Sequence, residues 1–262
     1  MHFPLHQCAT FAVDCKNIAL IAIFRKELNV FFSSLIGYIA ITIFLVANGL
    51  FNWVFTDTSI MSSGYADLQP FFNFAPWIFL FLVPAITMRS FAEEKNTGTL
   101  ELLATRPVTD LQIIAGKFLA AFTLVVFSVL PTIVYYFAIR ELASPTGNVD
   151  TGGIIGSYIG LTLLGGSFVA ISLFASAISN NQIVAFISGL FLCFICFYGF
   201  DALALLPVSE GSADAIFNAL SINQHYQNIS KGYIDFRDVL YFSSAIALFF
   251  LMTQTTLGSR RW

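Results

Sequence analysis

Six stretches of this chain are each long and apolar enough to cross a lipid bilayer as a helix. They lie at residues 35–55, 72–88, 118–138, 154–178, 183–203 and 239–257. The hydrocarbon layer is about 30 Å thick and an α-helix rises about 1.5 Å per residue, so about 20 apolar residues span it. The stretches lack the alternation of barrel strands and are joined by short connections. The sequence therefore predicts an all-α integral membrane protein with six transmembrane helices.

The composition supports this class. Hydrophobic residues make up 57% of the chain and charged residues only 10%, whereas about 25% of an average soluble domain is charged. A soluble domain of this size has no interior large enough for 30 phenylalanines, so lipid is the solvent that accepts them. No basic stretch indicates nucleic-acid binding. We expect membrane lipid as a partner and no nucleic acid.

The basic residues predict the orientation, because cytoplasmic connections carry an excess of lysine and arginine. Nine of the twelve lysines and arginines fall on one side of a six-span arrangement. These are Lys16, Arg25, Lys26, Arg89, Lys95, Arg106, Lys117, Arg260 and Arg261. The other side has Arg140, Lys231 and Arg237. We therefore expect a multi-pass membrane protein with both termini in the cytoplasm.

Almost no ionisable side chain interrupts the apolar stretches, although Asp201 falls near the end of the fifth. Ion-coupled carriers place such groups at membrane depth. The pattern therefore favours a protein whose energy comes from outside the bilayer, and a carrier that works without an ATPase is the rival interpretation. A phosphate-binding loop is also missing, because Leu111 and Phe118 flank Gly116-Lys117 where that motif requires glycine and Ser or Thr. We expect no catalytic residue, no metal site and no cofactor on this chain.

The connection between the second and third stretches, residues 89–117, carries the clearest functional pattern. Gly98 and Thr99 start a short helix there, Glu101 lies in its first turn, and Pro107 ends it. A short rigid helix between two transmembrane helices would act as a lever that passes cytoplasmic force to both. An ordinary solvated loop is the alternative.

Two further connections contain helix boundaries. Thr109 with Gln112 has the spacing of a capping box at the start of the third span. Ser221 with Gln224 has the same spacing in the fifth connection, where Gly232 is a helix stop. We therefore expect a short helix in the fifth connection, on the external side.

Residues 18–33, just before the first span, have the pattern of an amphipathic helix. An apolar side with Phe24, Leu28 and Phe31 opposes a basic side with Arg25 and Lys26. Such a helix lies along the membrane surface with its basic side toward the headgroups. The alternative is that it simply extends the first span.

Glycines at four-residue intervals mark the start of the fourth span. Gly152, Gly156 and Gly160 fall on one helix face, where small residues let backbones approach closely. This face packs either within the molecule or at an interface between subunits.

Several segments resemble a known family. The cytoplasmic connection FAEEKNTGTLELLATRPVTDLQIIAGK resembles that of type-2 ABC exporter permeases. The segments KELNVFFSSLIGYIAI, FFNFAPWIFLFLVPAITMRSFAEEK, GSYIGL and ISNNQIVAFISGLFLCFICFYGF are similar to the gliding-motility branch of that family in Bacteroidetes-type bacteria. The likeness covers residues 21–262, nearly the whole chain.

The resemblance implies a single permease domain over residues 18–262, preceded by an unassigned lead-in at 1–17. It implies two ATPase subunits that hydrolyse ATP with Mg²⁺, and a second membrane subunit or a copy of this chain. Glu93, Glu94, Gly98, Thr99 and Glu101 would form the coupling helix that docks into the ATPase, with Pro107 at its end. A structural anchor of a motility machine is the remaining alternative to an exporter.

Overall fold

The computed structural model describes residues 20–55, 60, 66–99, 108–145, 147–204, 217–232 and 235–259. The lead-in at 1–17 lies outside the described residues, as do residues 100–107 with Glu101 and Pro107. Every regular element among the described residues is helical. The prediction of an all-α chain is confirmed for this part of the protein.

The described elements are helices and single helical turns. In chain order they are a helix over Leu20–Ser33, α2 (Leu35–Trp53), α3 (Gln69–Asn96), α5 (Asp110–Val129), the 3₁₀ turn η1 (Leu130–Thr132), α6 (Ile133–Leu142), α7 (Thr151–Ile178), α8 (Gln182–Phe194), the π-helical turn η2 (Ile195–Gly199), α9 (Phe200–Ala204), α11 (Ile222–Ser230) and α12 (Phe236–Gly258).

Five helical segments of the described chain are long and apolar enough to cross a membrane. They are Gln69–Asn96, Asp110–Leu142, Thr151–Ile178, Gln182–Ala204 and Phe236–Gly258. The helices Leu20–Ser33 and Gly37–Trp53 meet at 71° and make a sixth if the pair counts as one broken span. The structure therefore supports a multi-pass helical membrane protein with five or six candidate spans.

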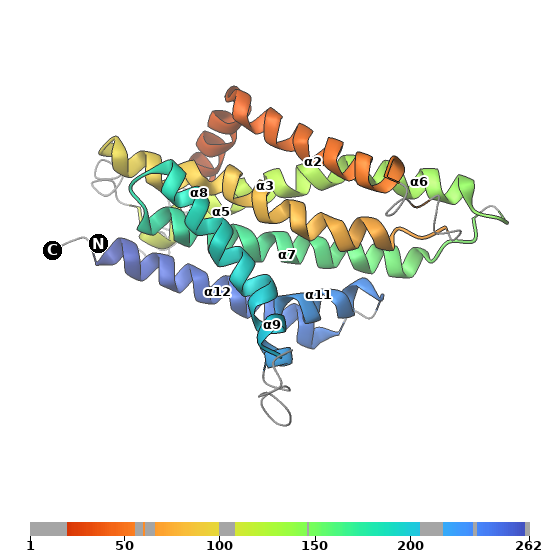
Figure 1. Cartoon of the computed structure of the whole chain (residues 1–262). Coiled ribbons are helices and arrows are strands. Elements are labelled where there is room, and N and C mark those ends of the chain that lie inside the picture. Colours follow the sequence, from red (N-terminus) through yellow and green to blue (C-terminus); the bar gives the residue numbers. More distant parts are fainter. Residues whose placement is uncertain are drawn as a thin grey trace, which may run out of the picture.

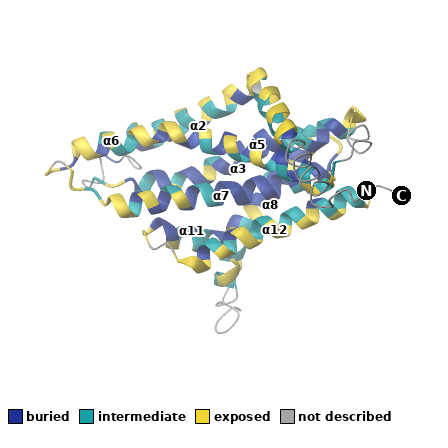
Figure 2. Ribbon diagram, turned by 180° about the vertical axis from the view of Figure 1, so that it is seen from behind, coloured by how far each residue is buried: buried dark blue, intermediate teal, exposed yellow. Residues whose placement is uncertain are grey.

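Helix α7 is the centre of the bundle. Of its apolar window 78% is buried, against 22% for the α8–α9 segment and 11% for α12, and Figure 2 shows the contrast between α7 and α12. Glycine explains part of it: a Cβ added at Gly165 would lie 2.8 Å from Val125 of α5 and 3.3 Å from Phe79 of α3. Small residues on α7 therefore let both helices approach closely.

The described basic residues of the predicted cytoplasmic side gather at one end of the bundle. We call this the basic end and define it by Arg25, Lys26, Arg89, Lys95 and Lys117. It contains the last turns of α3, the first turns of α5, the α7–α8 turn and the last turns of α12, at the left of Figure 1.

Helix α11 lies toward the opposite end, against α7 and the start of α3 (Figure 1). The Tyr226 hydroxyl donates to the Phe72 carbonyl at 2.6 Å. The Ser157 hydroxyl of α7 donates to the Ser230 carbonyl at 2.9 Å. These bonds attach the middle and the end of α11 to the long helices α3 and α7.

The predicted capping box at Thr109 is present, whereas the one at Ser221 is present only in part, because the Gln224 side chain donates to the Asn218 side chain instead. The Gln112 side chain accepts from the Thr109 backbone N–H at 3.0 Å, as in a capping box. The Ser221 hydroxyl accepts from the Gln224 N–H at 3.2 Å, and Gly232 ends the helical segment with φ +85°. The short helix predicted in the fifth connection is thus confirmed as α11.

The predicted loop at residues 89–117 is shorter in the structure. Helix α3 continues eight residues past the apolar stretch to Asn96, so Glu93 and Glu94 lie on a helix rather than in a loop. The prediction ended the helix where hydrophobicity ended. Alanine, glutamate and lysine are good helix formers, so the helix continues until Gly98, which has φ +69°.

Candidate functional site

The helix Leu20–Ser33 packs closely against α5 at Ile23. Ile23 is buried, and a Cβ added at Gly116 would lie 2.9 Å from Ile23 Cγ2. Real side chains essentially never approach that closely, so glycine at position 116 allows the two helices to meet. The 71° bend at the end of this helix also excludes a straight extension of the first span.

The bend is filled by an aromatic ring. Phe31 lies against Gly37, where an added Cβ would come within 2.5 Å of Phe31 Cε1. Phe24 and Leu28 are half-buried, and Arg25 is exposed. The apolar side of the predicted amphipathic helix therefore faces the bundle, and Arg25 points away from it.

Beside Gly116, Lys117 is buried among carboxylates. Its side chain is only 1% exposed. Its Nζ lies 2.8 Å from Glu27 Oε1 and 2.9 Å from Glu94 Oε2, and it donates to the Ser90 carbonyl at 2.6 Å. A buried charge is tolerated only when it is paired in this way. Lys117 thus joins α5 to α3 and to the helix Leu20–Ser33.

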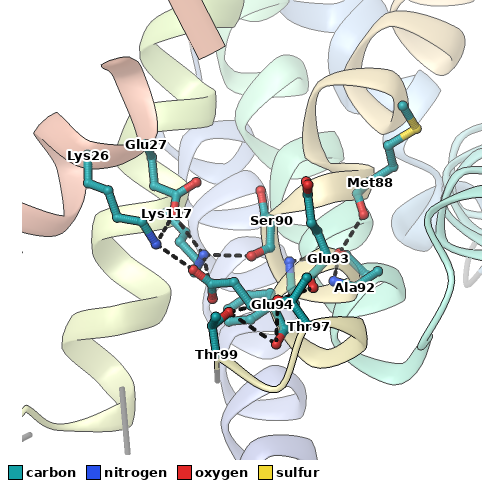
Figure 3. A network of polar contacts seen from close by, with 12 residues as sticks. Lys26, Glu27, Met88, Ser90, Ala92, Glu93, Glu94, Thr97, Thr99 and Lys117 are labelled. Atoms are coloured by element: carbon teal, nitrogen blue, oxygen red, sulfur yellow. Dashed lines mark hydrogen bonds and ion pairs between the residues drawn. The ribbon is translucent and has the colours of Figure 1, made fainter. Parts of the chain in front are cut away.

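Lys26 completes a four-residue ion cluster, which we define as Lys26, Glu27, Glu94 and Lys117 (Figure 3). Lys26 Nζ lies 2.7 Å from Glu94 Oε1 and 3.7 Å from Glu27 Oε1. Glu94 therefore bridges both lysines, and its contact with Lys117 is an ion pair without hydrogen-bond geometry. Two cations and two anions balance each other.

Unlike Lys117, Lys26 is partly exposed, with 53% of its side chain accessible. Partial burial acts to lower the pKa of Lys26, but the hydrogen bond and charge of Glu94 and the charge of Glu27 outweigh it, so its pKa is raised. The charged form of Lys26 is therefore favoured next to the cluster.

A serine of α7 holds α3 at the same level. The Ser176 hydroxyl accepts from the backbone N–H groups of Phe91 and Ala92, at 3.1 and 3.2 Å, and donates to the Met88 carbonyl at 3.1 Å. Ser176 is fully buried. The last turns of α3 are therefore fastened to the central helix as well as to the ion cluster.

The end of α3 leads directly into the predicted coupling helix. The Thr97 hydroxyl donates to the Glu93 carbonyl at 2.9 Å, and the Thr99 hydroxyl donates to the Glu94 carbonyl at 3.3 Å. Both threonines and Gly98 are exposed. Of the predicted coupling residues, the structure thus places Glu93, Glu94, Gly98 and Thr99 together at the end of α3.

The glycines of α7 lie at the opposite end and differ from one another. A Cβ added at Gly156 would lie 3.1 Å from the Ile229 carbonyl oxygen, and one at Gly160 would lie 3.0 Å from Ile229 Cγ2. Both glycines therefore contact α11 within the molecule. Gly152 is exposed, and an added Cβ there would meet only Asp150 among the described residues, so the structure does not place Gly152 in this packing.

Asp201 also serves the α11 end. Its carboxylate accepts from the Ser221 hydroxyl and from the Asn223 side-chain amide. His225 Nδ1 lies 2.6 Å from Asp238 Oδ1 of α12. Polar contacts with α9 and α12 thus hold α11, which gives Asp201 a structural role.

Sequence reasoning missed Ile23, Glu27 and the burial of Lys117. Lys117 looked like one more cytoplasmic lysine of the positive-inside pattern. The available signal was the position of Gly116-Lys117 about two helical turns after the N-cap Thr109, where a lysine faces its neighbouring helices.

Comparison with known proteins gives a family match. Residues 55–253 match the family model described as ABC-2 family transporter protein. The ion cluster draws Glu94 and Lys117 from inside this matched stretch and Lys26 and Glu27 from before it. No curated protein matches the chain in sequence.

Proposed function

Since the chain belongs to the ABC-2 family of transporter proteins, we propose that it is the membrane-spanning permease subunit of an ATP-driven exporter whose ATPase is a separate polypeptide. The family and the apolar helices make it a multi-pass permease component of an ABC transporter. The proposal adds that ATP in a partner subunit drives the protein and that the end of α3 receives the force.

The observation that carries the proposal is the buried Lys117. It is bound to carboxylates from two other elements, Glu94 of α3 and Glu27 of the helix Leu20–Ser33. A displacement of the α3 end would therefore move three elements together, because separating the ion pairs would leave buried charges uncompensated. We call the ion cluster the transmission joint, because at the basic end it would pass a movement of α3 to α5 and to the helix Leu20–Ser33.

The docking segment is the continuation of α3. Glu93, Gly98 and Thr99 lie at its start, and Glu101 and Pro107 follow in sequence. In the proposal, ATP binding closes the ATPase dimer and pushes this segment. The partner subunits hold and hydrolyse ATP with Mg²⁺, and this chain binds neither.

The same proposal sets the surroundings of the protein. The basic end faces the cytoplasm of a bacterium, the protein spans the inner membrane with six helices, and both termini are cytoplasmic. A second membrane subunit or a second copy completes the path. The resemblance of the segments at residues 26–41, 71–95 and 178–200 supports a link to gliding motility or secretion.

Two rivals make different predictions. A structural anchor of a motility machine would bind the ATPase without a movement of its spans. A carrier that needs no ATPase would bind none. A nucleotide-dependent movement of the spans distinguishes the exporter from the structural anchor. Recovery of a bound ATPase distinguishes the exporter from the carrier.

The experiment is a purification of the tagged chain from its native membrane under mild extraction, with bound proteins identified by mass spectrometry. We expect a P-loop ATPase that is lost from Glu93→Lys and Glu101→Lys variants. Glu141→Lys, at an exposed position at the end of α6, is the matched control and should retain the ATPase. Recovery of the chain without an ATPase would favour the carrier.

A further inference from the structure

A cavity of about 260 Å³ opens beside the ion cluster, between the helix Leu20–Ser33, α3 and α5. One part of its wall is apolar, with Val30, Phe31, Ile86 and Leu124. The other part is ionisable. A ligand that fills both parts must be an amphiphile, because a small polar ion would leave the apolar part empty.

Six ionisable side chains line the cavity, and four of them belong to the ion cluster. The remaining two are Arg89 and Glu93 of α3. No described carboxylate lies within ion-pair distance of Arg89, whose side chain makes only a 3.4 Å contact with the Ser34 hydroxyl. Its Nε is buried without a hydrogen-bond partner among the described residues. An unsatisfied buried donor on a charged group is costly, so Arg89 is poised for an anion.

Glu93 is the counterpart of Arg89. It lies four residues later on the same helix, where side chains are neighbours with about 5–6 Å between their Cβ atoms. Nevertheless, the described residues form no ion pair between Arg89 and Glu93, and no described cation pairs with Glu93. Among the described residues, the cavity thus presents a cation and an anion side by side that form no ion pair.

We propose that this cavity binds phosphatidylethanolamine from the lipid leaflet at the basic end. The guanidinium of Arg89 binds the phosphate, as arginine does with bidentate geometry. The carboxylate of Glu93 accepts hydrogen bonds from the primary ammonium, which two carbon atoms separate from the phosphate oxygen. Acyl chains pack on the apolar part of the wall near Phe31 and Leu124. The proposal needs only a membrane and does not depend on the ATPase.

The headgroup chemistry makes the proposal selective. Phosphatidylcholine carries the same phosphate, but its quaternary ammonium has no N–H to donate to Glu93. Phosphatidylglycerol has no cation at all. The loss of a hydrogen bond to a charged group weakens binding affinity by about tenfold or more. We therefore expect phosphatidylethanolamine to bind about tenfold more tightly than either lipid with identical acyl chains.

The test is native mass spectrometry of the delipidated full-length protein in detergent, titrated with these three lipids. Glu93→Gln should remove most of the preference for phosphatidylethanolamine over phosphatidylcholine and weaken phosphatidylcholine less, because the quaternary ammonium loses only a charge attraction and no hydrogen bond. Arg89→Gln should weaken both about tenfold, and Arg89→Lys should retain part of the binding. Arg25→Gln removes an exposed cation of the same end that does not line the cavity, and it should keep the preference.

Three results would overturn the proposal. The first is equal binding of the three lipids by the unmodified protein. The second is an equal loss of the preference in Arg25→Gln and Glu93→Gln, which would indicate general surface charge. The third is competition by soluble glycerophosphoethanolamine as strong as that of the lipid, which would make the ligand a soluble molecule.

Discussion

The ammonium of Lys117 lies 2.8 Å from the carboxylate of Glu27, which precedes it by 90 residues in the chain. This contact ties the helix before the first span to the first turns of α5. Glu94 lies on the other side of the same ammonium, so the end of α3 belongs to the same unit.

Replacing Lys117 by methionine should strongly destabilise the protein. The change leaves Glu27 and Glu94 without their buried counterion, and removal of one partner of a buried pair costs about 3–5 kcal/mol. Lys26→Met is the matched control, because Lys26 is half exposed and exposed pairs contribute about 0–1 kcal/mol. Unfolding in mixed micelles by SDS measures both. Equal effects of the two substitutions would contradict the burial of Lys117.

Adding a methyl group at Gly116 should separate the helix Leu20–Ser33 from α5. Gly116→Ala places a Cβ within 2.9 Å of Ile23, and overpacking of this kind costs about 1–3 kcal/mol. Combining it with Ile23→Ala should restore part of the loss, because the nearest atom, Ile23 Cγ2, is removed and only the Cβ of residue 23 remains at 3.1 Å. Thermal unfolding of the two single variants and the double variant measures this coupling. Strict additivity would refute the contact.

Removing the hydroxyl of Ser176 should loosen the end of α3. Ser176→Ala leaves the backbone N–H groups of Phe91 and Ala92 without their acceptor, at a cost of about 1–3 kcal/mol for a buried unsatisfied donor. Ser172→Ala, one turn earlier on α7, loses only a contact with the Cys193 thiol and should cost less than about 1 kcal/mol. Hydrogen exchange of the α3 end reports the difference, and unchanged protection there would be inconsistent with the serine contact.

Alanine should have opposite effects at two glycines of α7. Gly156→Ala places its Cβ 3.1 Å from the Ile229 carbonyl oxygen and should push α11 away, with a loss of about 1–3 kcal/mol. Among the described residues, an alanine Cβ at Gly152 meets only the Asp150 side chain, so Gly152→Ala should be neutral or gain up to about 1 kcal/mol from helix propensity. Proteolysis of the α11 segment distinguishes the variants. A destabilising Gly152→Ala would show that this face is occupied.

Much of the fold follows from local patterns. The apolar stretches, the capping box at Thr109 and Gln112, and the helix stop at Gly232 are properties of neighbouring residues, and the structure has each of them. The length of α3 did not follow from hydrophobicity, because helix propensity continues to Asn96 after the apolar residues end. Local sequence therefore predicts that a helix is present better than it predicts the residue at which the helix ends.

The site depended on contacts that no local pattern contains. Glu27 and Lys117 come together only because Ile23 fits against Gly116. Asp201 looked like a lone carboxylate at a span end, yet it accepts hydrogen bonds from Ser221 and Asn223. In both cases the partner is distant in sequence, so the role of the charge appears only in three dimensions.

The most direct test of the transmission joint is a distance measurement between spin labels in the complete complex with its ATPase. The four native cysteines are first replaced, and labels are placed on exposed residues: Asn96 at the end of α3, Arg25 on the helix Leu20–Ser33, and Met252 of α12 as the common reference. Double electron–electron resonance is recorded without nucleotide and after trapping with ATP and vanadate.

We expect trapping to shift both the Asn96–Met252 and the Arg25–Met252 distances. In a variant that combines Lys26→Met with Glu27→Gln, the Asn96–Met252 shift should persist and the Arg25–Met252 shift should be lost, because α3 is still pushed but both ion-pair links to the helix Leu20–Ser33, Lys26–Glu94 and Glu27–Lys117, are removed. An unchanged Arg25–Met252 shift in that variant would contradict the transmission joint. Distances that ignore nucleotide altogether would contradict the ATP-driven permease.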